Sequence, residues 1–211
     1  MSRWLYRLLV LLIGLLLLVL NAGLYFPAAG DYGTAAIPAS AVAQLNFIGE
    51  ALGSGAGGDM QGLFPEGYFF SHVLYGLSWV QVGLRADGDL RDEALREARW
   101  ALEQLDTYGH LTFSPNLDPP YGVFYVGWKN WLRGGILLLD PSDAETLARF
   151  EADCEALAVA FESRGTPFLP AYPNMAWPVD SVVGIATLSL HDHLLSPSYE
   201  SVISDWLTMA R

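Results

Sequence analysis

Hydrophobic positions follow helical spacing along most of the chain. Apolar residues recur every three to four positions, and no stretch of alternating apolar and polar residues predicts a strand. Three segments have charged residues opposite an apolar face, which predicts amphipathic helices. Their apolar faces comprise Leu90, Ala94, Ala98, Ala101 and Leu105, then Leu147, Phe150, Cys154, Leu157 and Phe161, then Tyr199, Val202, Ile203, Trp206 and Leu207.

Three other segments contain almost no charge. Residues 68–84 have no charged side chain, residues 123–139 have only Lys129 and Arg133, and residues 179–190 have only Asp180. A helix that is apolar on every side is normally buried on every side, so these segments predict three buried helices. An earlier helix is predicted at residues 41–52, followed by a glycine-rich loop at residues 53–62.

Local signals mark where the helices begin. Ser142 and Glu145 have the spacing of a capping box, and Ser196 with Pro197 predicts the start of the last helix. Each buried segment follows a proline, and Pro65, Pro120 and Pro178 are separated by 55 and 58 residues. Buried and amphipathic helices therefore alternate, which predicts an all-α array of about three helical hairpins over residues 41–211.

The N-terminal segment predicts membrane targeting. Residues 8–20 are an unbroken apolar run, and no charged residue occurs between Arg7 and Asp31. About 20 such residues span a bilayer, so residues 1–26 predict a single-pass anchor in contact with the membrane through residues 4–26. The two N-terminal arginines would keep that end cytoplasmic and the main domain extracytoplasmic. A cleaved signal peptide, followed by secretion, is the alternative, and residues 27–40 are predicted to be a linker.

Composition excludes several classes of function. Lys and Arg total 11 against 23 Asp and Glu, a formal charge of −12, which disfavours nucleic acid as a partner. The single cysteine excludes a disulfide framework. No spacing of ligands predicts a metal site, and no fingerprint predicts a cofactor.

The alternation of buried and amphipathic helices, with Trp177-Pro178-Val179-Asp180 at the start of a buried helix, resembles the (α/α) toroid of the six-hairpin glycosidase superfamily. Linalool dehydratase/isomerase is the second resemblance. A closed toroid has about six hairpins, so the resemblance implies an incomplete toroid here. A homo-oligomer or a missing C-terminal half would complete it; the alternative is a helical array that is not a toroid.

The toroid resemblance also implies a site, because the starts of the inner helices line the mouth of the cavity in this superfamily. Glu66 and Asp180 are then the candidate catalytic acid and base. An acid in the first turn of a helix also stabilises the helix dipole, which is the structural alternative. The candidate substrate-binding residues are Tyr68, His110, Tyr121, Tyr125, Trp128, Asn130 and Trp177, and their alternative is a role in the core.

Three functions follow from these residues. The first is a carbohydrate-active hydrolase or lyase with an aromatic cavity, acting on a carbohydrate or another small uncharged ligand. The second is a non-catalytic helical interaction module. The third is a terpenoid-alcohol dehydratase/isomerase, as the second resemblance implies.

Overall fold

The computed structural model describes residues 3–25 and 36–211, and the chain divides into two units at residues 1–38 and 39–211. The first unit contains α1 (Arg3–Tyr25). Residues 3–21 of this helix have a mean hydropathy of 2.2 and are unburied, so α1 is long and apolar enough to cross a membrane. A signal sequence has the same properties. Most of the predicted linker lies outside the described residues.

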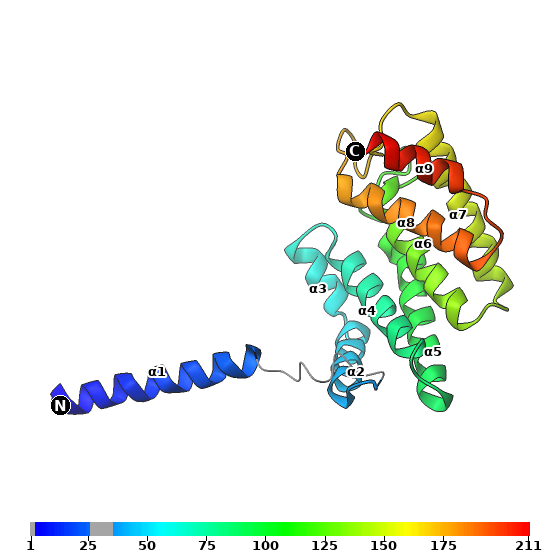
Figure 1. Cartoon of the computed structure of the whole chain (residues 1–211). Helices are drawn as coiled ribbons and strands as arrows, with labels where there is room; N and C mark the ends of the chain where they lie inside the picture. Colours follow the sequence, from blue (N-terminus) through cyan, green and yellow to red (C-terminus); the bar gives the residue numbers. More distant parts are fainter. Residues whose placement is uncertain (1–2, 26–35) are drawn as a thin grey trace. The chain divides into compact units, whose positions relative to one another are not determined.

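The second unit is built from helices, as the sequence predicts (Figure 1). Its described part has no strand and only an isolated bridge between Tyr172 and Met175. In chain order the helices are α2 (Ala39–Gly53), α3 (Ala56–Leu63), α4 (Gly67–Gly83), α5 (Gly88–Gln104), a π-helical turn at Leu105–Gly109, α6 (Gly122–Leu139), α7 (Ala144–Ser163), α8 (Pro178–Leu194) and α9 (Glu200–Met209).

Successive helices pair along the chain. Helix α4 packs on α5, α6 on α7 and α8 on α9, while α6 also contacts both α4 and α8. Helix α6 is the centre of this arrangement, because none of its residues is exposed. Glycine permits its close contact with α8: a Cβ atom on Gly127 would lie 3.1 Å from the backbone nitrogen of Gly184.

Helix α8 differs from the prediction of a helix buried on every side. Val179 is 63% exposed and Val182 is 50% exposed, so one apolar face of α8 is uncovered within the described part of the chain. Helix α4 likewise exposes Leu74. A charge-free sequence therefore identifies an apolar helix, but only the neighbouring elements determine which faces are covered.

The predicted loop at residues 53–62 is wrong, because α3 occupies most of it. Gly55 has a φ of 106°, which ends α2 and lets the chain start a new helix. Helix α3 then packs on α4, where a Cβ atom on Gly67 would collide with the carbonyl of Met60. Tertiary packing therefore overrides the low helix propensity of these glycines.

Two predicted helix starts are also wrong. Helix α7 is capped by Asp143, whose side chain accepts a hydrogen bond of 3.1 Å from the backbone nitrogen of Thr146. Helix α9 begins at Glu200, beyond Ser196 and Pro197. The Asp192 carboxylate accepts hydrogen bonds from the backbone nitrogens of residues 198 and 199, which keeps that segment outside the helix.

Candidate functional site

Glu66 and Asp180, which are distant in sequence, lie near one another in the fold. Glu66 immediately precedes α4, and Asp180 is the third residue of α8. The hydroxyl of Tyr172 donates a hydrogen bond to Glu66 Oε1. Glu66, Tyr172 and Asp180 therefore form a cluster, which we call the acid cluster.

The segment that carries Tyr172 is fixed by the backbone. The nitrogen of Val123 donates to the carbonyl of Pro170 at 3.0 Å, and the nitrogen of Leu169 donates to Ser181 Oγ at 2.9 Å. These bonds hold the α7–α8 connection against the starts of α6 and α8. Tyr172 thereby reaches Glu66 from a segment without regular secondary structure.

Gly122 gives this segment room at the start of α6. It has a φ of 85°, in the left-handed region that favours glycine. A Cβ atom at this position would lie 2.5 Å from the carbonyl oxygen of Ala171. Glycine is therefore required on two grounds, backbone conformation and contact with the residue before Tyr172.

Burial determines the electrostatics of the acid cluster. Asp180 is only 5% exposed, and no described residue donates a hydrogen bond to its carboxyl group. Burial, and after it the negative charge of Glu66, raise the pKa of Asp180 from 3.8 to about 6. Burial, then the hydrogen bond to Glu66, also raise the pKa of the Tyr172 hydroxyl, which stays protonated. The cluster thus contains a carboxylic acid that holds its proton to near-neutral pH.

Aromatic rings surround the acid cluster on its inner side. The Tyr172 ring lies 5.9 Å from Phe113 and 6.2 Å from Phe124, measured between ring centroids. Phe113 and Phe124 are buried and also contact Phe69. These rings form an apolar wall that lowers the local dielectric constant and thereby favours the neutral form of a nearby acid.

Trp177 lies at the start of α8, on the solvent side. It is 52% exposed, and its carbonyl accepts a hydrogen bond of 3.1 Å from the backbone nitrogen of Asp180. An exposed indole within three residues of a buried acid is suitable for stacking against a ligand. The role of Trp177 in substrate binding stays a prediction.

His110 and Tyr121 lie at the start of α6, with ring centroids 5.7 Å apart. Tyr121 also contacts Tyr125, whose ring lies 5.2 Å from Phe113. These residues therefore connect to the acid cluster only through an aromatic chain. The Tyr125 side chain is buried, and its hydroxyl donates to the carbonyl of Leu105 at 3.2 Å, so it is part of the core.

Three predicted binding residues contact other parts of the fold. The Tyr68 hydroxyl donates to Gln104 Oε1 at 3.2 Å, and Trp128 packs edge-on against Phe70 at 6.0 Å. Asn130 is fully buried, and its amide donates to the carbonyl of Phe150 at 3.0 Å. Asn130 therefore lies at the contact between α6 and α7, because its amide nitrogen donates to a backbone carbonyl of α7.

Lys129 is explained by a polar network behind the acid cluster. It lies 3.2 Å from Asp106 and donates to the Tyr125 hydroxyl at 3.0 Å. Arg133 also contacts Asp106, at 2.9 Å, and forms an ion pair with Asp153. Burial and the charge of Arg133 lower the pKa of Lys129. The charges on α6 are therefore paired within the protein, without a ligand.

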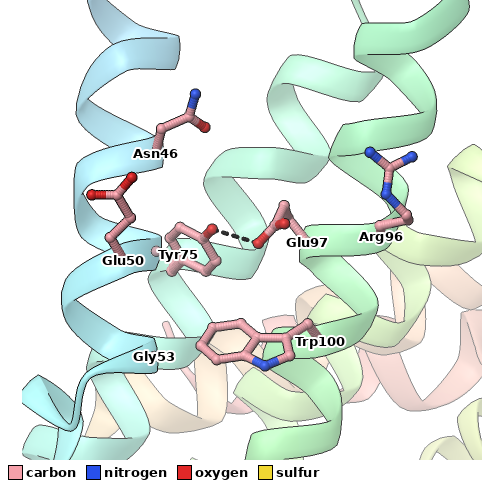
Figure 2. Close-up of a pocket in the computed structure, with 8 residues that line it drawn as sticks. Asn46, Glu50, Gly53, Tyr75, Arg96, Glu97 and Trp100 are labelled. Carbon is pink, nitrogen blue, oxygen red and sulfur yellow. Dashed lines mark hydrogen bonds between the residues drawn. The ribbon is translucent and has the colours of Figure 1, made fainter.

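At least four hollows, with volumes of about 310 to 590 Å³, lie on other parts of the second unit. A polar groove of about 590 Å³ opens between α2, α4 and α5 (Figure 2). An apolar groove of about 430 Å³ opens between α2, α3 and α4. No group of three or more potential metal ligands occurs among the residues that the structure describes.

Comparison with known proteins provides no relative from which a function can be transferred. No family model, no curated protein and no solved structure matches this chain. The residues themselves are therefore the basis for a functional argument.

Tyr172 is the site residue that the sequence analysis missed. It lies in the connection before α8, where no periodic pattern indicates which side chains point inward. Its only signal in the sequence is its position five residues before Trp177. The hydrogen bond to Glu66 becomes visible only in the folded chain.

Proposed function

We propose that the acid cluster is the catalytic centre of a hydrolase or lyase that acts on a carbohydrate or a similar uncharged, hydroxylated compound. The observation that carries the proposal is the convergence of Glu66, Tyr172 and Asp180 beside an exposed tryptophan. Enzymes that cleave a glycosidic bond usually use two carboxyl groups, one protonated and one ionised.

Asp180 is the acid in this proposal. Its pKa of about 6 lets it donate a proton to the oxygen of the departing group as the carbon–oxygen bond breaks. In hydrolysis, a water molecule then supplies the hydroxyl group to the carbon and a proton to the base. In elimination, the base instead removes a proton from the neighbouring carbon.

Glu66 is the base or the stabilising charge. It accepts the hydrogen bond from Tyr172, which fixes the orientation of its carboxylate towards α8. Tyr172 is a positioning residue in this proposal, because its hydroxyl acts through Glu66. Trp177 is proposed to stack on the substrate at the entrance to the cluster.

The proposal includes the (α/α)-toroid architecture. Helices α4, α6 and α8 would form part of its inner layer, and α5, α7 and α9 part of its outer layer. The consecutive contacts α4–α6 and α6–α8 support this view.

The decisive test is hydrolysis or elimination by the full chain in a nonionic detergent. Substrates are a panel of oligosaccharides and linear terpenoid alcohols, and the variants are Asp180→Asn and Glu66→Gln. Each variant is expected to lose at least ~100-fold in kcat/KM, the scale of general acid–base catalysis, while keeping its helical circular dichroism. Glu103→Gln, at an exposed acid on α5, is the control.

Activity that survives Asp180→Asn on every substrate would overturn the proposal. The pH profile gives an independent readout, because activity that needs protonated Asp180 falls as pH rises through about 6. Tyr172→Phe is expected to change this pH profile and kcat more than KM, because it releases Glu66 without removing an acid.

The proposed location is the outer side of a membrane, with α1 as an anchor. Arg3 and Arg7 precede the apolar part of α1, and positive charge is retained in the cytoplasm. An alkaline phosphatase fused after Arg211 is expected to be active in cells. If this fusion is inactive and a cytoplasmic reporter at the same position is active, the main domain lies in the cytoplasm and the proposed topology is wrong.

A second candidate function is self-association as a non-catalytic module. The exposed apolar face of α8, with Val179 and Val182, favours it, because exposed valines on one helix face are suited to covering by another copy. Val182→Ser is expected to shift an oligomer towards monomer in analytical ultracentrifugation. A wild-type chain that sediments as a monomer would exclude this candidate.

A further inference from the structure

The polar groove between α2, α4 and α5 is separate from the acid cluster. Its main side chains are Asn46, Glu50, Tyr75, Arg96, Glu97 and Trp100 (Figure 2). Tyr75 lies nine residues after Glu66, which corresponds to about 13 Å along α4. The groove and the acid cluster therefore use different parts of the same helix.

Tyr75 fixes one carboxylate of the groove. Its hydroxyl donates to Glu97 Oε2 at 2.6 Å, and the tyrosine side chain is almost fully buried. Burial, then the hydrogen bond to Glu97, raise the pKa of Tyr75, so that the hydroxyl stays a donor. Gly49 permits this arrangement, because a Cβ atom there would collide with the hydroxyl. Glu97 thus has one oxygen bound to Tyr75, and its other oxygen has no hydrogen-bond donor among the residues that the structure describes.

The carboxylates of the groove form no ion pair with a basic group of the described residues. Within the described residues, no basic nitrogen lies within 4.0 Å of the carboxylate of Glu50 or Glu97. Arg96 belongs to the lining, but its guanidinium points away from the Trp100 ring in Figure 2. Glu50 projects from α2 and Glu97 from α5, so the two walls of the groove each present a negative charge.

Trp100 provides an aromatic surface between these charges. The indole is half-buried, and its ring meets the Tyr75 ring edge-on at 5.8 Å. In Figure 2 the indole forms the lower boundary of the groove, below the Tyr75–Glu97 hydrogen bond. Indole faces attract ammonium groups through the charge distribution of the ring. A ligand in the groove would therefore meet an aromatic face, two carboxylates and, at Arg96, one guanidinium group.

We propose that this groove binds an organic cation, specifically a primary alkyl diamine. One ammonium group would lie at Glu97 and Trp100, and the other at Glu50 on the opposite wall. A neutral sugar would also stack on Trp100, but it would leave both carboxylates without a counter-charge. The opposed, unpaired carboxylates therefore favour a dication.

The test is a calorimetric titration of the full chain in a nonionic detergent with 1,4-diaminobutane. Butane-1,4-diol is the matched neutral ligand, because it has the same length and hydrogen-bonding ends. Saturable binding of the diamine, weakened by added salt and absent for the diol, is the expected result. Equal binding of both compounds, or saturable binding of neutral saccharides alone, would overturn the proposal.

Variants locate the binding in this groove. Glu50→Gln and Glu97→Gln are each expected to raise the Kd about two- to fivefold, the range of a solvent-exposed ion pair. Trp100→Leu is expected to have an effect of about the same size through the lost aromatic face. Glu50 is exposed, so its substitution keeps the test independent of folding. Unchanged affinity in Glu50→Gln would refute the assigned site.

Two further controls separate this inference from the proposed catalytic function. Glu103→Gln removes an acid from α5 outside the groove and is expected to leave the Kd unchanged. Asp180→Asn is also expected to leave the Kd unchanged, because Asp180 does not line the groove. Loss of diamine binding in Asp180→Asn would contradict a separate site.

Discussion

Asp180→Asn is expected to stabilise the protein, and the stabilisation should depend on pH. Asp180 is buried beside Glu66 without a hydrogen-bond donor among the described residues, so its ionisation costs free energy in the folded state. Asparagine has nearly the same shape and no charge, and it removes this cost. A residue retained at such a cost is a candidate for function.

The magnitude follows from the pKa of Asp180. A rise from 3.8 to about 6 corresponds to about 3 kcal/mol, at 1.36 kcal/mol for each pKa unit. This value already contains every favourable and unfavourable effect of the site on the charge, including the position of Asp180 in the first turn of α8. The gain expected for Asp180→Asn above about pH 7 is therefore about 3 kcal/mol.

The sign of the pH dependence is fixed by proton binding. Between pH 3.8 and about 6 the folded chain holds the Asp180 proton, whereas the unfolded chain releases it. The stability of the wild type should therefore fall, through this group, as pH rises through that window. Below the window both side chains are neutral, and the two proteins should have similar stability.

The assay is urea unfolding of the full chain in nonionic detergent, followed by far-UV circular dichroism at about pH 4 and about pH 8. The difference in unfolding free energy should grow from near zero to about 3 kcal/mol between these pH values. Glu103→Gln, at an exposed acid, is the control and should show no such growth. A difference that is constant with pH, or a variant less stable at about pH 8, would refute the reasoning.

Three further substitutions test the packing around the acid cluster by urea unfolding. Gly122→Ala should destabilise the protein by about 2 kcal/mol or more, because φ is 85° and the new Cβ atom would collide with a carbonyl oxygen. Gly165 lies in open space, so Gly165→Ala is the control and should have little effect. Phe150→Ala should lower the free energy of unfolding by about 3–5 kcal/mol, because it leaves an internal cavity. Val159 is half-exposed, so a loss of stability in Phe150→Ala no greater than in Val159→Ala would contradict the place of Phe150 in the core. Arg133→Met should cost about 1.5–3 kcal/mol by removing charge-assisted hydrogen bonds to Asp106 and Asp153. If the ion pair with Asp153 is the cause, Arg133→Met should cost less in an Asp153→Asn background, and an equal cost in both backgrounds would contradict this explanation.

Helix patterns in the sequence identified most of the architecture. The spacing of Phe150, Cys154 and Leu157 predicted the buried face of α7, and all three side chains are fully buried. The segment at residues 123–139, in which only Lys129 and Arg133 are charged, predicted the central helix α6, which has no exposed residue. These predictions succeed because hydrophobic periodicity is a local property that burial of one helix face requires.

The errors concern features that depend on neighbouring elements. Helix α3 forms from glycine-rich sequence because it packs on α4, and Val182 is exposed because no described element covers that face of α8. Asn130 was predicted to bind a ligand because it is polar on an apolar helix; its amide nitrogen donates to the α7 backbone, a partner that the sequence does not identify, and its role in binding stays a prediction. Sequence shows that a buried polar group needs a partner, and the fold determines which partner it has.

The sequence by itself determined that this protein is helical, that it begins with an apolar helix able to span a membrane, and that Glu66 and Asp180 lie at helix starts. Only the tertiary structure decided that these two acids lie close enough to influence one another, and that Tyr172 binds Glu66. The path of the α7–α8 connection is set by hydrogen bonds to α6 and α8. The sequence of such a connection has no periodicity, so it does not indicate which side chains lie inside. Its side chains gain their neighbours only when distant segments pack together. The same packing excludes water from the buried acid and thereby raises its pKa.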